Sequence, residues 1–240
     1  MQTILEVKDV SRIFASKKIA LDKVSFSVSK GDFIVIGGSN GSGKSVLMSL
    51  IAGLDTPSSG EIILQKGIQA GLVFQDADSQ ILGESPWEDV SFGAKNCGLK
   101  KGELKACVQK ALEKTGLEQK KDFPARQMSG GEKRRLAVAG ILAMGRDLII
   151  FDEPFANLDW PGVKQVCAIL KDLKEEGKSI ILLTHEIEKV LALANRFIIL
   201  DKGKIRFDGK PSEGLKLNLE EFSIRNPLNS YNKLEDLLWL

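Results

Sequence analysis

The hydrophobic positions of the chain follow a strand pattern and a helix pattern in alternation. Segments that are apolar almost throughout, typical of strands buried on both faces, are FIVIG (33–37), DLIIFDE (147–153) and SIILLTH (179–185). Between the last two, apolar residues recur at helical spacing, at positions 163, 166, 167, 170 and 173. This alternation predicts an α/β fold with a mainly parallel sheet that is covered on both faces.

Other segments complete the predicted elements. Further strands are expected over residues 3–10, 19–28, 56–64 and 70–75, and a strand hairpin over 196–207. From about residue 79 to 145 the pattern changes to helix, with one apolar stripe at positions 104, 107, 108, 111 and 112. Another helix is expected over 186–194, and the mixed segment 211–240 predicts a short C-terminal helical appendage.

Composition and charge narrow the class of protein. The chain has 43% hydrophobic and 28% charged residues, as an ordinary soluble globular protein does. Its formal net charge of +2 is too small for a strong field toward nucleic acid, so no nucleic-acid partner is expected. The cysteines are scattered without metal-ligand spacing and suit reduced thiols in the cytosol: Cys97, Cys107 and Cys167.

The sequence also indicates whether the chain itself could enter a membrane. No apolar run approaches the ~20 residues that a bilayer span needs. The first ten residues carry Glu6 and Asp9 and no long apolar core, so no signal peptide is expected. Any connection with a membrane is therefore expected to pass through a partner protein.

A glycine-rich loop joins the strand at 33–37 to the helix that follows it. The loop fits the phosphate-binding pattern G-x-x-x-x-G-K-[ST] and comprises Gly38, Ser39, Asn40, Gly41, Ser42, Gly43, Lys44 and Ser45. Its glycines let successive backbone N–H groups turn toward phosphate oxygens, and the helix presents its positive end. Lys44 is expected to reach the β- and γ-phosphates of ATP, and Ser45 to ligate Mg²⁺.

A pair of carboxylates follows the apolar strand that ends near residue 152. A phosphate-binding loop needs a second group to hold its metal ion, and Asp152 suits that role. Glu153 is placed to polarise the attacking water. Taken alone, the same pair is equally consistent with a plain strand terminus.

A second glycine element determines the family that the sequence resembles. MSGGEKRRLAVAG (128–140) places Ser129, Gly130 and Gly131 directly before a helix, which makes another helix start with free amides. This stretch resembles the LSGGQ signature of ATP-binding-cassette ATPases, with Met128 for Leu and Glu132 for Gln. The family's other motifs follow in order: the loop ending at Lys44 and Ser45, Gln75, the signature, Asp152 with Glu153, Asp159 and His185.

The resemblance covers roughly residues 4–210 and implies a fold and a domain plan. The fold is that of a P-loop NTPase, with a RecA-like, mainly parallel sheet, an N-terminal antiparallel β subdomain and an inserted α-helical subdomain. An ATPase domain is expected over 1–210, with the helical subdomain at about 79–145 and the appendage over 211–240.

The resemblance also implies a mechanism. Each ATP lies between Lys44 of one subunit and the signature amides of another, so two cassettes close head to tail, as a homodimer or a heterodimer. Glu153, His185 and Gln75 are the implied catalytic residues, with His185 contacting the γ-phosphate. The implied nucleotide-binding residues are Phe14, the loop 38–45, Val46, Ser129, Gly130, Gly131 and Asp159; Ser45, Gln75 and Asp152 are implied for Mg²⁺. Phe14 would stack on adenine, although a core position suits it nearly as well.

Within the family, the segment after Gln75 resembles that of energy-coupling-factor and cobalt-type importers. Those proteins carry Q-x-x-D-x-Q, which Gln75, Asp78 and Gln80 match, but Ala77 stands where a proline is usual. The resemblance implies uptake of vitamins or transition-metal ions at the cytoplasmic face of the membrane. Asp78, Gln80 and Trp87 would line a groove for a helix of an integral membrane partner, although Trp87 equally suits packing at a helix start.

Two other functions remain open at this point. A cassette ATPase that acts on nucleic acid or the ribosome is the first, but this chain has no basic excess, no long coiled coil and no second cassette. A small-molecule P-loop kinase is the second, and the extra glycine element and Asp159 speak against it. The transported substrate is not encoded in this chain, because the ATPase subunit never touches it.

Overall fold

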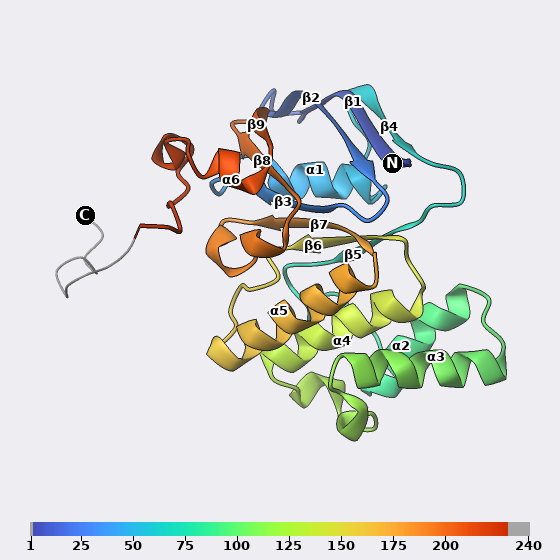
Figure 1. The fold of residues 1–240 in the computed structure, drawn as a ribbon. Coiled ribbons are helices and arrows are strands. Elements are labelled where there is room, and N and C mark those ends of the chain that lie inside the picture. The colour runs from blue at the N-terminus through green and yellow to red at the C-terminus, as the bar shows by residue number, and fades with distance from the viewer. Residues whose placement is uncertain (1, 230–240) are drawn as a thin grey trace.

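The computed structural model describes residues 2–229, which form two sheets and a layer of helices (Figure 1). The strands are β1 (Thr3–Ile13), β2 (Ile19–Ser29), β3 (Phe33–Gly37), β4 (Ser59–Leu64), β5 (Ala70–Val73), β6 (Leu148–Asp152), β7 (Ser179–Thr184), β8 (Arg196–Asp201) and β9 (Lys204–Gly209). The helices are α1 (Lys44–Ile51), α2 (Pro86–Asn96), α3 (Lys101–Lys114), α4 (Gly130–Ala143), α5 (Trp160–Glu175) and α6 (Pro211–Gly214).

The larger sheet has the strand order β5-β6-β7-β3-β8-β9. Its first five strands are parallel, and only β9 pairs antiparallel, with β8. Every residue of β3, β6 and β7 is buried, as their apolar composition predicts for central strands. Gly37 pairs with Thr184, and Asp152 pairs with Leu183. The ends of β3, β6 and β7 therefore meet at one edge of the sheet, which is where the glycine loop begins.

A smaller antiparallel sheet, in the order β2-β1-β4, packs over α1 (Figure 1). Leu5, Val24, Ile36 and Leu47 belong to one buried cluster that joins this sheet, α1 and one face of the larger sheet. On the opposite face, α4 and α5 cover the sheet, and Phe151, Val138 and Leu170 are buried between them. The predicted fold class is confirmed: a mainly parallel core with an N-terminal antiparallel sheet and an inserted group of helices.

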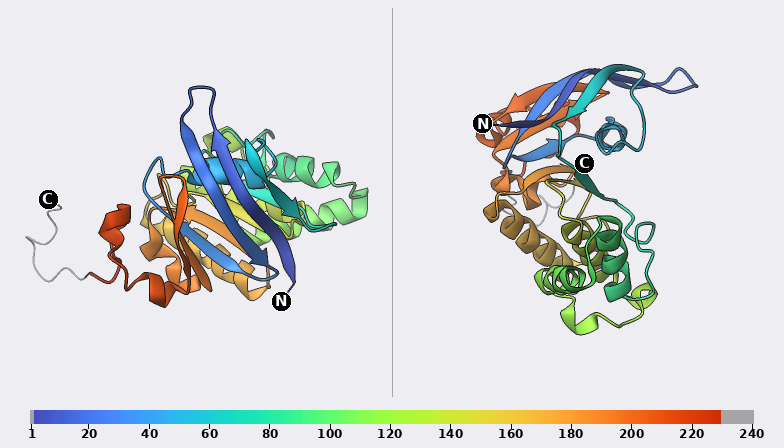
Figure 2. Two further views of the ribbon diagram at one scale, coloured as in Figure 1. Left: turned by 90° about the horizontal axis from the view of Figure 1, so that it is seen from above. Right: turned by 90° about the vertical axis from the view of Figure 1, so that its right-hand side faces the viewer.

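The inserted helices α2 and α3 pack on α4, away from the larger sheet (Figure 2). Val108, Ala111 and Leu112 are buried in a separate cluster there, and Leu104 and Cys107 pack at its edge. The apolar stripe expected in this segment therefore faces the core of the helical group. The domain limits given above stay a prediction.

The prediction of an α-helix over residues 186–194 is wrong. The segment forms two short 3₁₀ turns, Ile187–Lys189 and Leu191–Leu193, separated at Val190, whose φ is −141°. The chain must return there from the end of β7 to the start of β8. The backbone leaves the helical conformation at Val190, and Ile187, Val190 and Leu191 are buried in the cluster on the α4 and α5 face of the larger sheet.

The described part of the C-terminal appendage, residues 211–229, contains α6 and a 3₁₀ turn at Leu219–Phe222. Leu219 and Ile224 are buried in the cluster that lies against α5 and the larger sheet. The remainder of the predicted appendage lies outside the described residues. Among the helices that the structure describes, none is long and apolar enough to cross a bilayer.

Candidate functional site

The glycine loop between β3 and α1 wraps around the ammonium group of Lys44. That group donates to the carbonyl oxygens of Gly38 at 2.7 Å and Ser39 at 3.1 Å, and the residue is only 6% exposed. Burial lowers the pKa of Lys44, and the nearby carboxylates of Glu153 and Asp152 oppose that shift. The buried hydroxyl of Ser42 has no partner. The loop therefore holds a buried cation whose charge an anionic ligand would satisfy.

Glycine is required in this loop on steric grounds. Gly43 has a φ of 108°, and a Cβ there would lie 2.6 Å from the carbonyl oxygen of Ala20. At Gly38 a Cβ would lie 2.2 Å from the carbonyl oxygen of Leu200. Both approaches are shorter than any real Cβ contact, so the loop closes on its neighbours only without side chains.

A cavity of about 250 Å³ opens beside the loop. Its lining includes Phe14, Asn40, Gly41, Gly43, Lys44, Ser45, Val46, Gln75, Glu153 and His185, all of them predicted, together with Lys18, Ile19 and Ala20. Phe14 is 38% exposed, and the Arg12 guanidinium lies 5.5 Å from its ring centroid. The alternative that Phe14 is a core residue therefore does not fit. Lys18 and Ile19 were missed, because nothing in their own sequence indicates that the β1–β2 turn folds over the loop.

Asp152 ends β6 and is buried at the floor of this site. Burial is the main cause that raises its pKa, and the neighbouring charge of Glu153 adds to it; a hydrogen bond from the Ser45 side chain, Lys44 and Arg134 act in the opposite direction. Its Oδ1 atom is buried without a hydrogen-bond partner. A carboxylate oxygen and a hydroxyl side by side fit a hard cation such as Mg²⁺.

Glu153 and His185 face each other at the carboxyl ends of β6 and β7. Oε2 of Glu153 lies 3.0 Å from Nδ1 of His185 and accepts a hydrogen bond from its backbone N–H at 3.3 Å. Oε1 lies 3.7 Å from the Lys44 ammonium. Glu153 has a φ of 44°, a left-handed conformation that costs a residue with a side chain free energy. The fold therefore holds a buried carboxylate in a strained backbone position, aimed between a lysine and a half-exposed imidazole.

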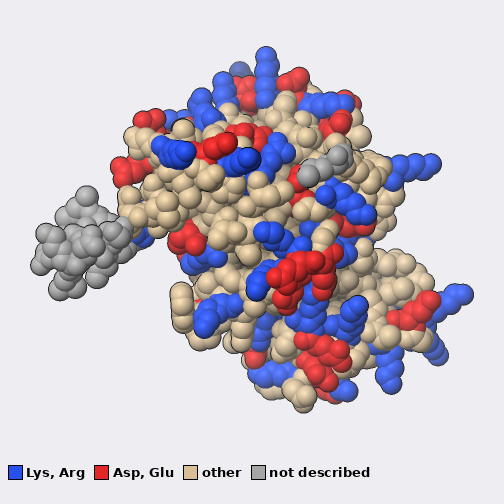
Figure 3. All heavy atoms as spheres, viewed as in Figure 1, with Lys and Arg blue, Asp and Glu red and all other residues tan. Residues whose placement is uncertain are grey.

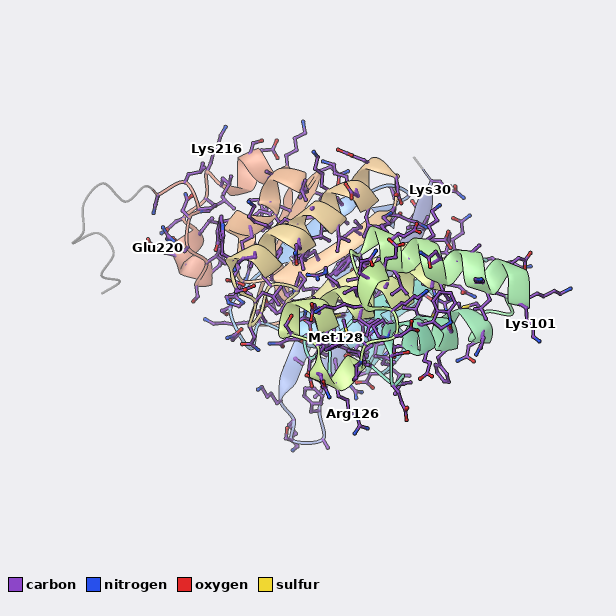
Figure 4. All side chains as sticks on the ribbon, turned by 90° about the horizontal axis from the view of Figure 1, so that it is seen from below. Lys30, Lys101, Arg126, Met128, Lys216 and Glu220 are labelled. Atoms are coloured by element: carbon purple, nitrogen blue, oxygen red, sulfur yellow. The ribbon has the colours of Figure 1, made fainter. Side chains whose placement is uncertain are left out.

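The second glycine element, which contains Ser129, Gly130 and Gly131, lies outside the cavity beside Lys44. Ser129 caps α4 by accepting from the backbone N–H of Glu132 at 3.3 Å, and Glu132 accepts from the Ser129 N–H at 3.0 Å. Glutamate in the signature is thus used as a capping group. Figure 4 labels Met128, just before the chain enters α4. In the described chain, no signature residue lines the cavity beside Lys44.

Asp159 lies with the signature rather than with the cavity. Its side chain accepts from the backbone N–H of Gly162 at 2.9 Å and caps α5. A Cβ built on Gly130 would lie 3.8 Å from the carbonyl oxygen of Asn157. The structure therefore groups the predicted residues into two half-sites on different parts of one chain.

The groove residues predicted after Gln75 differ in their surroundings. The carboxylate of Asp78 is 66% exposed and lies 2.5 Å from the Lys133 ammonium. The Gln80 amide is turned inward: it donates to the carbonyl of Leu72 and accepts from the N–H of Phe74, each at 3.0 Å. Trp87 packs against the core of the helical group, as the helix-start alternative requires. Of these three residues, only Asp78 thus exposes its polar group to solvent, in an ion pair with Lys133, and the groove itself stays a prediction.

Asp152→Asn is expected to raise the thermal unfolding midpoint (Tm) of the nucleotide-free protein at neutral pH by about 2–4 °C, the shift that 1 kcal/mol produces in a chain of this size. The folded pKa of Asp152 lies above its unfolded value, so ionisation destabilises the fold as the pH rises through that window. The gain is therefore expected to vanish below pH 3.8, the ordinary value. Calorimetry across pH measures it, with Asp147→Asn, exposed at the other end of β6, as the control. A lower Tm at neutral pH would contradict this account of the buried charge.

Comparisons with known proteins agree with this geometry. A family model described as ABC transporter matches residues 21–156. The chain is 37% identical to a putative ABC transporter ATP-binding protein of Pyrococcus horikoshii, over 93% of this chain and 90% of that protein. It is 38% identical to the energy-coupling factor transporter ATP-binding protein EcfA1 of Clostridium novyi, over 88% of this chain and 81% of the relative.

Two solved structures are similar as well. CbiO1 of Clostridium perfringens, described as part of the ABC transporter complex CbiONQ, superposes with a TM-score of 0.82 at 33% identity, covering 95% of this chain and 97% of CbiO1. A dimeric ATP-binding cassette bound to ADP and inorganic phosphate superposes with a TM-score of 0.77 at 26% identity, covering 87% of this chain and 99% of the other.

Proposed function

Since the chain belongs to the ABC transporter family and is an ATPase of that family, we propose that two copies of it close head to tail on two ATP molecules and energise an energy-coupling-factor importer. One observation carries the proposal. Lys44 and the Ser129-Gly130-Gly131 amides are both intact, yet they belong to separate half-sites in one chain. Two copies supply both halves of two sites, and a C2-symmetric pair satisfies each half at once.

Nucleotide binding follows from the groups that line the cavity. Lys44 exchanges its two loop carbonyls for β- and γ-phosphate oxygens. The free ring face of Phe14 stacks on adenine, with Ile19 beside it. Ser45, Asp152 and Gln75 would hold Mg²⁺, which would neutralise charge on the phosphates. Asp159 supports the signature half-site of the same copy.

Hydrolysis needs a base and a group that keeps the base in place. Glu153 accepts the proton of the attacking water, because its buried carboxylate lies beside the phosphate-binding lysine. His185 holds Glu153 through the 3.0 Å contact to Nδ1 and extends its other ring nitrogen toward the γ-phosphate. Gln75 enters from the segment after β5 and senses the same phosphate. The base and its neighbours thus lie together at the carboxyl edge of the sheet.

The transport role rests on the names of the relatives and on the segment after Gln75. EcfA1 and CbiO1 are described as parts of transporters, and the segment after Gln75 in this chain resembles that of energy-coupling-factor importers, with Asp78 exposed at its edge. We infer a peripheral position at the cytoplasmic face of the membrane and cargo of the vitamin or transition-metal class. The visible surface mixes Lys and Arg with Asp and Glu (Figure 3), which offers no support for a nucleic-acid role.

Asp78→Lys is expected to leave the ATPase rate of the isolated subunit within a few-fold of wild type and to abolish binding to the membrane partner. An exposed carboxylate at this edge suits a helix that carries arginine, whose fork binds a carboxylate through two hydrogen bonds. A lysine there opposes the incoming charge at a partly desolvated contact. Co-purification of the membrane complex through a tagged subunit measures the effect.

The control for that substitution is Lys133→Ala. It removes the ion pair of Asp78 without changing the carboxylate, so partner binding should persist. Normal assembly and transport with Asp78→Lys would show that the groove is elsewhere. Loss of assembly with both variants would assign the effect to the ion pair rather than to the partner.

A further inference from the structure

A buried arginine connects the signature helix to the segment that carries Gln75. Arg134 lies on the second turn of α4 and is 3% exposed. Its guanidinium donates from Nη1 to the carbonyl of Phe74 and from Nη2 to the carbonyl of Gln75, the latter at 2.5 Å. These carbonyls follow the end of β5, at the point where the chain enters the cavity. One side chain thus fixes two successive peptide groups of the segment.

Packing alone does not account for this arginine. Burial lowers its pKa, which means that the charged form is desolvated, and its Nε atom has no partner. In the part of the chain that the structure describes, no carboxylate forms an ion pair with it within 4.0 Å. Its loss would leave the carbonyl oxygens of Phe74 and Gln75 without this donor. The guanidinium therefore serves these two carbonyls, on the segment that carries Gln75.

The neighbouring residue provides a contrast. Arg135, which is 9% exposed, donates instead to the Oε1 atom of Gln165 on α5 and so joins two helices. Lys133, on the other side, reaches Asp78 at 2.5 Å. Two successive cations of α4 therefore hold the segment after β5, and Gln80 braces it from within. In this arrangement Gln75 lines the cavity together with Glu153 and His185.

We propose that Arg134 is a positioning residue that sets Gln75 against the phosphate site and ties it to the signature helix. This inference rests on the proposed function. α4 begins at Ser129-Gly130-Gly131, which meet the nucleotide of the second copy, and one turn later Arg134 holds the residue that meets the nucleotide of its own copy. A rigid helix thus carries movement from one ATP to the other. The partner's nucleotide, on docking at α4, places Gln75 for hydrolysis in this copy.

The test is a double-substitution cycle on the purified full chain. Arg134→Met is expected to lower kcat about 10- to 100-fold, the cost of misplacing a catalytic group by roughly 1 Å. It is also expected to raise the Mg²⁺ concentration that gives half-maximal rate, while ATP affinity without Mg²⁺ changes little. Gln75→Ala should show the same pattern. Because both act through one side chain, the double variant should be no slower than Gln75→Ala alone.

Two further variants keep the result interpretable. Arg134→Lys retains the charge but not the planar fork, so it should stay slow; it replaces Arg134→Met in the cycle if that variant does not fold, as judged by thermal unfolding. Arg135→Met removes another buried arginine, which holds α5, and should keep kcat and the Mg²⁺ requirement near wild type.

Three results would overturn the inference: a wild-type kcat in Arg134→Lys, rate losses that multiply in the double variant, or an equal loss in Arg135→Met. An absence of ATP hydrolysis in the wild-type chain is a different outcome, because it would contradict the proposed function itself.

Discussion

Glu153→Gln is expected to bind ATP as the wild type does and to lose about 10²- to 10⁴-fold in turnover, the range that a general base contributes. The amide keeps the size of the carboxylate and its contact with His185, but it accepts no proton from water. It also removes a negative charge next to the phosphates, so the closed pair is not released. Size-exclusion chromatography with Mg-ATP should therefore show a stable dimer, and a phosphate-release assay should show almost no product.

The matched control is Glu186→Gln, which makes the same change at a neighbouring carboxylate that is paired with Lys189 and does not line the cavity. Its turnover should equal that of the wild type. If Glu153→Gln also hydrolyses ATP at the wild-type rate, Glu153 is not the base and the strained carboxylate needs another explanation.

Substitutions in the two glycine elements are expected to impair different steps, ATP binding in one case and dimer closure in the other. Lys44→Ala should weaken ATP binding by the monomer about 10- to 150-fold, since hydrogen bonds to a charged group contribute about 1.5–3 kcal/mol. Gly130→Asp should leave monomer binding nearly intact and still abolish dimer closure and hydrolysis, because it places an anion where the partner's γ-phosphate must lie. Titration with a fluorescent ATP analogue and a steady-state ATPase assay separate the two effects.

The fold is expected to tolerate the Gly130→Asp substitution. A Cβ at Gly130 meets only the carbonyl oxygen of Asn157, at 3.8 Å, and its φ is not positive. Gly102→Asp, at an open position in the first turn of α3, is the control for adding an acid near a helix start. Equal losses of monomer affinity in Lys44→Ala and Gly130→Asp would place the signature in the same subunit's site.

The central strands and the glycine loop could be predicted because their causes are local. A strand that is buried on both faces has to be apolar at every position, and β3, β6 and β7 are. The residues that follow these strands, Lys44 and Glu153 among them, meet because parallel strands end at one edge. The pattern therefore contained both the sheet and the main part of its site.

The rest depends on partners that are distant in sequence. Apolar spacing over 186–194 indicates a buried side, and Ile187, Val190 and Leu191 are buried, but it does not show that the backbone leaves the helical conformation at Val190. The sequence does not distinguish a glutamine whose amide faces solvent from one, such as Gln80, whose amide is hydrogen-bonded to the backbone of Phe74. Arg134 stands in a run of basic residues that is typical of a solvated face, and only the fold shows that it is buried.

Each ATP is proposed to lie between Lys44 of one copy and Ser129-Gly130-Gly131 of the other, and mixing the Lys44→Ala and Gly130→Asp chains tests this arrangement. In a mixed pair of Lys44→Ala and Gly130→Asp chains, both defects fall in one site and the other site is intact. Equimolar mixing should therefore restore about a quarter of the wild-type ATPase rate, since half of the pairs are mixed and each has one working site of two. At an ATP concentration well below the weakened Kd of Lys44→Ala, each variant alone should show almost no hydrolysis. If the mixture stays as inactive as its components, the two half-sites do not come from different copies and the account is contradicted.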